Sequence, residues 1–149
     1  MDSATHILLV EDNRMDVELT LDAFHEARLG NTIHVSPNGQ DALDYLFGRG
    51  TYADRKAHPM PGLILLDLKL PGVDGFEVLR QVKSTPILKR VPVVVLTSSK
   101  EEGDRALSYD RGANSYIVKP VSFEGFLGVV RQIDGYWLSL NVAAPKEEE

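Results

Sequence analysis

The stretch LILLDLKLPG, residues 63–72, decides how this chain folds. Its first four residues are apolar without a break, which is typical of a strand that helices cover on both faces. Asp67 follows that strand directly, and Pro71 and Gly72 indicate a turn just beyond it. Because an unpaired buried charge is costly, such a carboxylate is expected to be paired, protonated or bound to a metal. The stretch therefore predicts a buried strand that places an acid at the edge of a sheet.

The run ILLV, residues 7–10, ends in the same way, with Glu11 and Asp12 directly after it. If the two runs form neighbouring parallel strands, these acids and Asp67 converge at one edge of the sheet. Helix capping explains one acid at this position, but not two acids that face Asp67. Close carboxylates repel one another, so either one is protonated or a divalent cation compensates them. Ligands that are all oxygen atoms favour Mg²⁺ or Mn²⁺.

Apolar runs alternate with amphipathic stretches along the whole chain. This strict alternation predicts an α/β fold, a doubly wound parallel sheet of five strands with right-handed crossovers. Ligands of such sheets bind outside the carboxyl ends of the strands. The expected strands are residues 6–10, 32–36, 63–66, 93–96 and 115–118. The expected helices are residues 14–28, 40–47, 75–84, 100–111 and 122–140.

Length and composition indicate one domain, residues 1–140, followed by a flexible acidic tail at 141–149 and no output domain. A formal net charge of −6 argues against nucleic-acid binding, which requires a concentrated basic surface. No apolar run approaches the roughly 20 residues that span a bilayer, so we expect no membrane insertion. The chain starts without the basic segment of a signal peptide and contains no cysteine. These features fit a cytoplasmic protein.

The segment GRGTYADRKAHPMP, residues 48–61, departs from this regular pattern. It is polar, contains both glycine and proline, and carries four basic or histidine side chains. We expect an extended surface loop between the second helix and the third strand. It is either a tolerated insertion or a loop that recognises a partner.

Four motifs resemble the receiver domain of response regulators, the CheY-like proteins of two-component signalling. They are ILLVEDN at 7–13, LILLDLKLPGVDGFEVL at 63–79, VPVVVLTSS at 91–99 and GANSYIVKP at 112–120. All four occur in order and together span most of the chain. The resemblance implies a flavodoxin-like (βα)5 fold with strand order 2-1-3-4-5. The long segment before Leu63 and the lengthened last helix further resemble the single-domain regulators that partner bacterial and cyanobacterial phytochromes.

The resemblance implies that Asp67 is the phosphoacceptor of a Mg²⁺-dependent reaction. Asp12, Asp67 and the main-chain carbonyl of Lys69 would ligate the metal, and Glu11 would act through a metal-bound water. The family often has aspartate where Glu11 stands. An ionised carboxylate is an established nucleophile toward phosphorus, and phosphoryl transfer demands mainly alignment and charge neutralisation.

The resemblance also assigns residues around the phosphoacceptor. Lys119 would contact a phosphoryl oxygen, and a cis peptide bond between Lys119 and Pro120 would fix its approach. Thr97 and Tyr116 would form the switch that responds to phosphorylation. Three further positions control donor access or tune hydrolysis of the acyl phosphate in similar domains: Ser98, Lys69 and Ser99.

A receiver of this kind is a phosphorylation switch and not a turnover enzyme, because it catalyses only its own phosphorylation and dephosphorylation. A sensor histidine kinase, in the narrower reading a bacteriophytochrome, would be the donor. The signal would pass by contact with a downstream protein or along a phosphorelay. A homodimer through the fourth helix, fifth strand and fifth helix is a further expectation. Tyr136 and Trp137 lengthen the last helix, either to pack back on the domain or to meet a second subunit.

Two other function classes fit parts of the pattern. A Mg²⁺-dependent aspartyl-phosphate phosphatase or mutase typically carries a second acid two residues after the nucleophile, where this chain has Lys69. A pseudo-receiver or flavodoxin-like cofactor binder would be a binding module without phosphorylation. The intact acids, Thr97 and Lys119 count against a pseudo-receiver, and no phosphate-cradling glycine loop is present.

Overall fold

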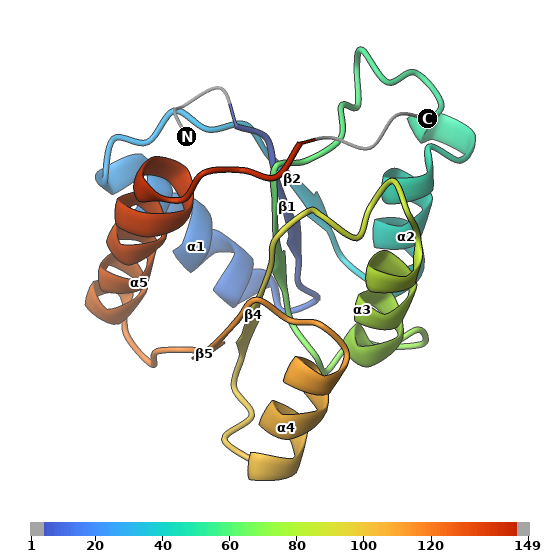
Figure 1. Ribbon diagram of the computed structural model, residues 1–149. Coiled ribbons are helices and arrows are strands. Elements are labelled where there is room, and N and C mark those ends of the chain that lie inside the picture. The colour runs from blue at the N-terminus through green and yellow to red at the C-terminus, as the bar shows by residue number, and fades with distance from the viewer. Residues whose placement is uncertain (1–4, 146–149) are drawn as a thin grey trace.

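The computed structural model describes residues 5–145, which form a five-stranded parallel sheet between two layers of helices (Figure 1). The strand order is β2-β1-β3-β4-β5, which confirms the predicted topology. The predicted strands agree with the structure to within one residue at each end. The strands are β1 (Ile7–Val10), β2 (Ile33–Ser36), β3 (Leu63–Leu66), β4 (Val93–Thr97) and β5 (Ser115–Val118).

Within the described residues, an α-helix follows each of the five strands. In Figure 1, α1 and α5 lie on one side of the sheet, and α2 and α3 lie on the other. The fourth helix lies beside α3 and β5. The helices are α1 (Arg14–Glu26), α2 (Gly39–Phe47), α3 (Gly75–Ser84), α4 (Glu102–Asp110) and α5 (Phe123–Gly135).

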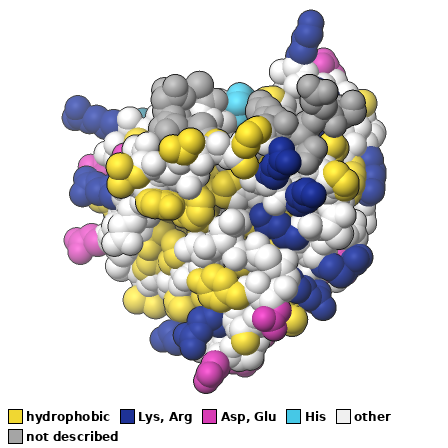
Figure 2. Space-filling view, in the orientation of Figure 1, with side chains coloured by type: hydrophobic (Ala, Val, Ile, Leu, Met, Phe, Trp, Pro, Cys, Tyr) yellow, Lys and Arg dark blue, Asp and Glu magenta, His cyan; other side chains and the backbone are white. Residues whose placement is uncertain are grey.

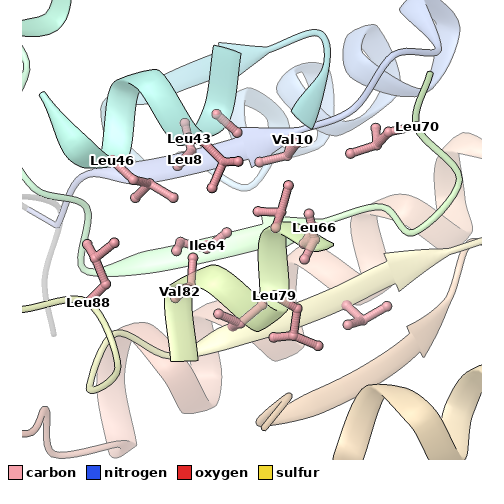
Figure 3. Close-up of a cluster of buried hydrophobic side chains, with 14 of the residues drawn as sticks. Leu8, Val10, Leu43, Leu46, Ile64, Leu66, Leu70, Leu79, Val82 and Leu88 are labelled. Atoms are coloured by element: carbon pink, nitrogen blue, oxygen red, sulfur yellow. The ribbon is translucent and has the colours of Figure 1, made fainter. Parts of the chain in front are cut away.

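The sheet separates two hydrophobic cores, because successive residues of a strand point to opposite faces. Leu8 and Val10 of β1 pack with side chains of α2 and α3, whereas Ile7 and Leu9 pack with those of α1 and α5. Figure 3 shows the first of these cores, in which the strand residues meet leucines such as Leu43 of α2. Burial of both faces explains why β1, β3 and β4 are apolar at nearly every position.

The last predicted helix is not regular over its whole length. The α-helix ends at Gly135, and a π-helical turn, η2 (Tyr136–Leu140), continues the chain. Trp137 of this turn packs against the core on the α1 and α5 side, whereas Tyr136 is half exposed. Residues 141–145 form no helix or strand, and residues 146–149 of the predicted tail lie outside the described residues.

The segment predicted as an extended loop instead folds back onto α2. It contains a short 3₁₀ turn, η1 (Gly50–Tyr52), whose Tyr52 hydroxyl donates to Asp41 at 2.8 Å. The Arg55 guanidinium donates to the main-chain carbonyls of Tyr45 at 2.7 Å and Leu46 at 3.1 Å. Carbonyls at the end of a helix lack partners within it, so Arg55 satisfies two of them and ties the segment to α2. Partner recognition by this segment stays a prediction.

None of the helices among residues 5–145 is both long enough and apolar enough to cross a membrane. This agrees with the sequence, in which no apolar stretch reaches the required length.

Gly75, the first residue of α3, lets this helix approach the strand that carries Asp67. A Cβ atom at this position would meet the carbonyl oxygen of Asp67 and the Cα atom of Leu68. We expect Gly75→Ala to lower the free energy of unfolding by about 2 kcal/mol, because main-chain atoms cannot move aside as a side chain can. Urea unfolding followed by circular dichroism measures the change.

Gly128, within α5, provides the control, because a Cβ atom there would meet no atom within 4 Å. Gly128→Ala is expected to raise the free energy of unfolding by up to about 1 kcal/mol through helix propensity alone. Equal effects of the two substitutions would contradict the close approach at Gly75.

Candidate functional site

Three carboxylates meet at the carboxyl edge of the sheet. Val10 at the end of β1 pairs with Leu66 at the end of β3, so the residues that follow these strands lie side by side. One oxygen from each of Glu11, Asp12 and Asp67 lies within 4.8 Å of the others. Glu11 and Asp67 are buried, whereas Asp12 is exposed. The structure thus brings together the acids that the sequence placed at this edge.

Lys119 extends from the end of β5 over these acids. Its Nζ atom lies 2.6 Å from Glu11 Oε1, 2.8 Å from Asp16 Oδ2 and 3.0 Å from Asp67 Oδ2. An ammonium group has three N–H donors, and here each of them has a carboxylate acceptor. The Lys119 side chain is only 7% exposed, so these ion pairs form largely out of water.

Lys119 takes its position from the main chain that continues β5. Its N–H donates to the Thr97 carbonyl at 2.7 Å, which extends the β4–β5 ladder by one residue. The expectation of a cis bond before Pro120 is wrong, because that peptide bond is trans. The trans form is intrinsically favoured before proline by about 0.5–1 kcal/mol, and the extended ladder delivers the lysine side chain without the rarer isomer.

The site carries more negative than positive charge. Burial raises the pKa of Glu11 from its ordinary 4.5 to about 7, although the hydrogen bond with Lys119 opposes the rise. Burial also acts to lower the pKa of Lys119, but its hydrogen bonds with Asp16 and Glu11 outweigh that effect and the pKa is raised. The site holds four carboxylates, those of Glu11, Asp12, Asp16 and Asp67, and a single ammonium cannot neutralise their charge. Oxygen donors with this excess charge fit a hard divalent cation.

The predicted switch residues lie around the end of β4. Thr97 is fully buried, and its Oγ1 atom accepts a long hydrogen bond of 3.4 Å from the Ser99 N–H. The Tyr116 hydroxyl donates to the Ser99 carbonyl at 3.0 Å, so β5 is linked to the segment that joins β4 to α4. Ser98 between them is exposed. Thr97 and Tyr116 thus contact the same short segment from two strands.

Two of the predicted tuning residues are joined by an acid on α4. Asp104 Oδ2 accepts from the Ser99 hydroxyl at 2.6 Å and lies 3.1 Å from Lys69 Nζ. These hydrogen bonds hold the pKa of Asp104 below its usual range and raise the pKa of Lys69. The main-chain N–H of Lys69 also donates to Asp67 Oδ1, at 3.4 Å. Asp104 therefore links the loops that follow β3 and β4 across the site.

Asp16 and Asp104 belong to the site, but reading of the sequence missed them. Asp16 had a usable signal, because it follows Asp12 by four residues and so lies about one helical turn beyond the sheet edge. Asp104 had none, since its role depends on how α4 is oriented over the loop after β4.

Comparison with known proteins places this geometry in a family. Residues 7–131 match the response regulator receiver domain, and the chain belongs to that family. This family agrees with the predicted fold and with the motifs that indicated it.

The similar proteins include phytochrome response regulators. The chain is 39% identical to response regulator Rcp1 of Synechocystis sp. over 132 residues, which are 89% of this chain and 88% of Rcp1. It is 42% identical to the probable methanogenesis regulatory protein FilR2 of Methanothrix harundinacea over 135 residues, 91% of this chain and 84% of FilR2. The phosphorylated cyanobacterial phytochrome response regulator RcpA superposes with a TM-score of 0.89 at 39% identity, covering 95% of this chain and 99% of RcpA. The Mn²⁺-bound form of Rcp1 superposes with a TM-score of 0.85 at 36% identity, with the same coverage.

The raised pKa of Glu11 predicts how stability depends on pH without metal. Between pH 4.5 and about 7 the folded protein holds a proton on Glu11 that the unfolded chain releases. The free energy of unfolding should therefore fall as pH rises through this window, with a contribution from Glu11 of about 3 kcal/mol. Denaturant unfolding in EDTA at a series of pH values measures it.

Glu11→Gln should flatten this part of the pH dependence. Glu18→Gln is the matched control, because Glu18 lies exposed on α1. Parallel pH curves for the wild-type protein and Glu11→Gln would contradict the assignment of this titration to Glu11.

Proposed function

We propose that this receiver accepts a phosphoryl group on Asp67 from the phosphohistidine of a sensor histidine kinase, with a divalent cation bound at the site. The observation that carries the proposal is the position of Asp67, which lies 3.0 Å from Lys119 and within 4.8 Å of two other acids. A buried nucleophilic carboxylate, a cluster of oxygen ligands and an ammonium are the groups that phosphoryl transfer to aspartate requires.

The donor set fits Mg²⁺ or Mn²⁺, because it contains oxygen atoms only. Asp12 and Asp67, with the main-chain carbonyl of Lys69, would hold the cation, and Glu11 would act through a bound water. The cation would neutralise charge on the carboxylates and on the transferred group. A Mn²⁺-bound form of Rcp1 supports this choice of metal.

The chain's own residues would divide the remaining work. A carboxylate oxygen of Asp67 attacks phosphorus, the P–N bond of phosphohistidine breaks, and its electron pair stays with the imidazole. The Lys119 ammonium donates a hydrogen bond to a phosphoryl oxygen in place of its present bond to Asp67. The Thr97 hydroxyl donates to the phosphoryl group once it is formed, which draws the segment after β4 toward the site.

The new charge would act on the surface formed by α4, β5 and α5. Thr97 and Tyr116 both contact the segment around Ser99, and Asp104 ties that segment to α4. A phosphoryl group adds negative charge and acceptor oxygens, so it can bias the position of such an element. The result is a phosphorylation-dependent contact with a downstream protein or with a phosphorelay partner.

The same surface would form a homodimer. Figure 2 shows hydrophobic side chains gathered over α5 and toward α4. Independently, four hydrophobic residues of α4, of β5 and of the segment between β5 and α5 are exposed: Leu107, Tyr109, Val118 and Val121. Sedimentation velocity with and without acetyl phosphate measures the dimer, and a monomer under both conditions would contradict this part of the proposal.

The protein would act as a switch and not as a turnover enzyme. The residue two positions after Asp67 is Lys69, whose ammonium pairs with Asp104, so the site has no second acid there to act on a leaving group. Steady hydrolysis of phosphomonoesters by the purified protein would instead favour a phosphatase.

Phosphorylation by a small donor tests the proposed function directly. In the presence of Mg²⁺ and acetyl phosphate, we expect the intact mass to increase by one phosphoryl group. EDTA should prevent the increase because the carboxylates then repel the donor, and Asp67→Asn should prevent it because the nucleophile is missing. Asp110→Asn, an exposed change on α4, should leave it unaltered. Labelling of Asp67→Asn to the wild-type level would contradict the site.

Similarity to Rcp1 and RcpA supports a phytochrome kinase as the donor. We expect purified phytochrome histidine kinases to transfer phosphate to this protein at least about tenfold faster than unrelated histidine kinases, because partner surfaces select by differences in affinity. Radiolabel transfer over time measures the preference. Equal rates from both groups of kinases would contradict the phytochrome assignment and leave the receiver function intact.

A further inference from the structure

Among residues 5–145, Asp16 is the carboxylate partner of Lys119 that does not belong to the three-acid cluster. The cluster consists of Glu11, Asp12 and Asp67, whereas Asp16 lies in the first turn of α1. Its N–H donates to the side chain of Asn13 at 3.0 Å, so the helix cap fixes its main chain. Its Oδ2 atom accepts from Lys119 Nζ at 2.8 Å.

A cation in the cluster would weaken the three ion pairs of Lys119 to different extents. The cation would bind Asp67 directly and Glu11 through a water, and both of these acids now accept from Lys119. It would neutralise their charge and repel the ammonium, since like charges a few ångströms apart interact strongly. Asp16 stands outside the cluster and keeps its charge available to Lys119.

The ion pair between Lys119 and Asp16 also joins α1 to the start of α5, and these two helices pack together independently of the three-acid cluster. Lys119 lies just before α5, and Asp16 is on α1. Phe24 of α1 and Phe126 of α5 belong to the same buried core. The distance between the two main chains is therefore set by this packing. A long lysine side chain has many rotamers, and a fixed carboxylate at its end selects among them.

We propose that Asp16 is a positioning residue, which keeps the Lys119 ammonium beside Asp67 when the cation is bound. One N–H of Lys119 then stays with Asp16, and the N–H that points to Asp67 is free to meet a phosphoryl oxygen. This inference rests on the proposed phosphorylation of Asp67, and it adds a residue that acts through Lys119.

The first test compares two variants that each remove one negative charge from α1. Asp16→Asn removes the anchor, and Asp22→Asn removes an exposed carboxylate of the same helix. At saturating Mg²⁺ and acetyl phosphate, the maximal phosphorylation rate of Asp16→Asn should fall about tenfold, since a hydrogen bond between charged groups is lost. Asp22→Asn should stay within about twofold of the wild-type rate. Equal rates for the two variants would overturn the proposal.

The second test needs no phosphorylation. In protein with ¹⁵N-labelled lysine, the Nζ protons of Lys119 are expected to remain protected from solvent exchange when Mg²⁺ is added. Asp16→Asn should lose this protection with Mg²⁺ present, whereas Asp22→Asn should keep it. The resonance is assigned by its absence in Lys119→Met. An unchanged Lys119 resonance in Asp16→Asn overturns the proposal whatever the rates show.

The two tests also separate this inference from the proposed function. If the wild-type protein takes no phosphoryl group, the proposed function fails. The protection of Lys119 in Mg²⁺ still decides whether Asp16 holds the lysine in place.

Discussion

The ammonium of Lys119, shared among three carboxylates, is the interaction on which the rest of the site depends. It joins the ends of β1 and β3 to the first turn of α1, with its nitrogen 2.6–3.0 Å from each partner. Several features of the fold bring Lys119 and its partners together. Parallel pairing aligns the ends of β1 and β3, the β4–β5 ladder extends to Lys119, and Gly75 lets α3 begin against Asp67. Each of these features sets where a charged group of the site stands.

The site carries excess negative charge, which favours the binding of a cation. Burial, with the nearby charge of Asp67, raises the pKa of Glu11 to about 7 although Lys119 opposes the rise. A phosphoryl group on Asp67 would redistribute the hydrogen bonds of Lys119 and Thr97. The bonds among Thr97, Ser99, Tyr116 and Asp104 give that local change a route to α4 and β5.

The sequence was sufficient for the sheet and for the acids at its edge, because each acid directly follows an apolar run whose direction the alternation of elements determines. The role of Asp16 was harder to predict from the sequence, since the helix residue that faces a site depends on how α1 is rotated about its axis. The polar segment at 48–61 was expected to be extended, but its arginine and tyrosine side chains find acceptors on α2. The last helix was expected to be continuous, yet its regular part ends at Gly135, a residue type that weakens helices. The isomer of the Lys119–Pro120 bond was inferred from the family, and no local pattern in this chain specified it.

We propose that Asp67 itself forms an acyl phosphate. Sodium borohydride reduces an aspartyl phosphate to homoserine, so it marks the modified residue covalently in the wild-type protein. After reaction with acetyl phosphate and Mg²⁺, reduction and peptide mass spectrometry should find homoserine at position 67, and should find none there when EDTA is present. Homoserine at another acidic position, or phosphate on a side chain that borohydride does not reduce, would contradict the account.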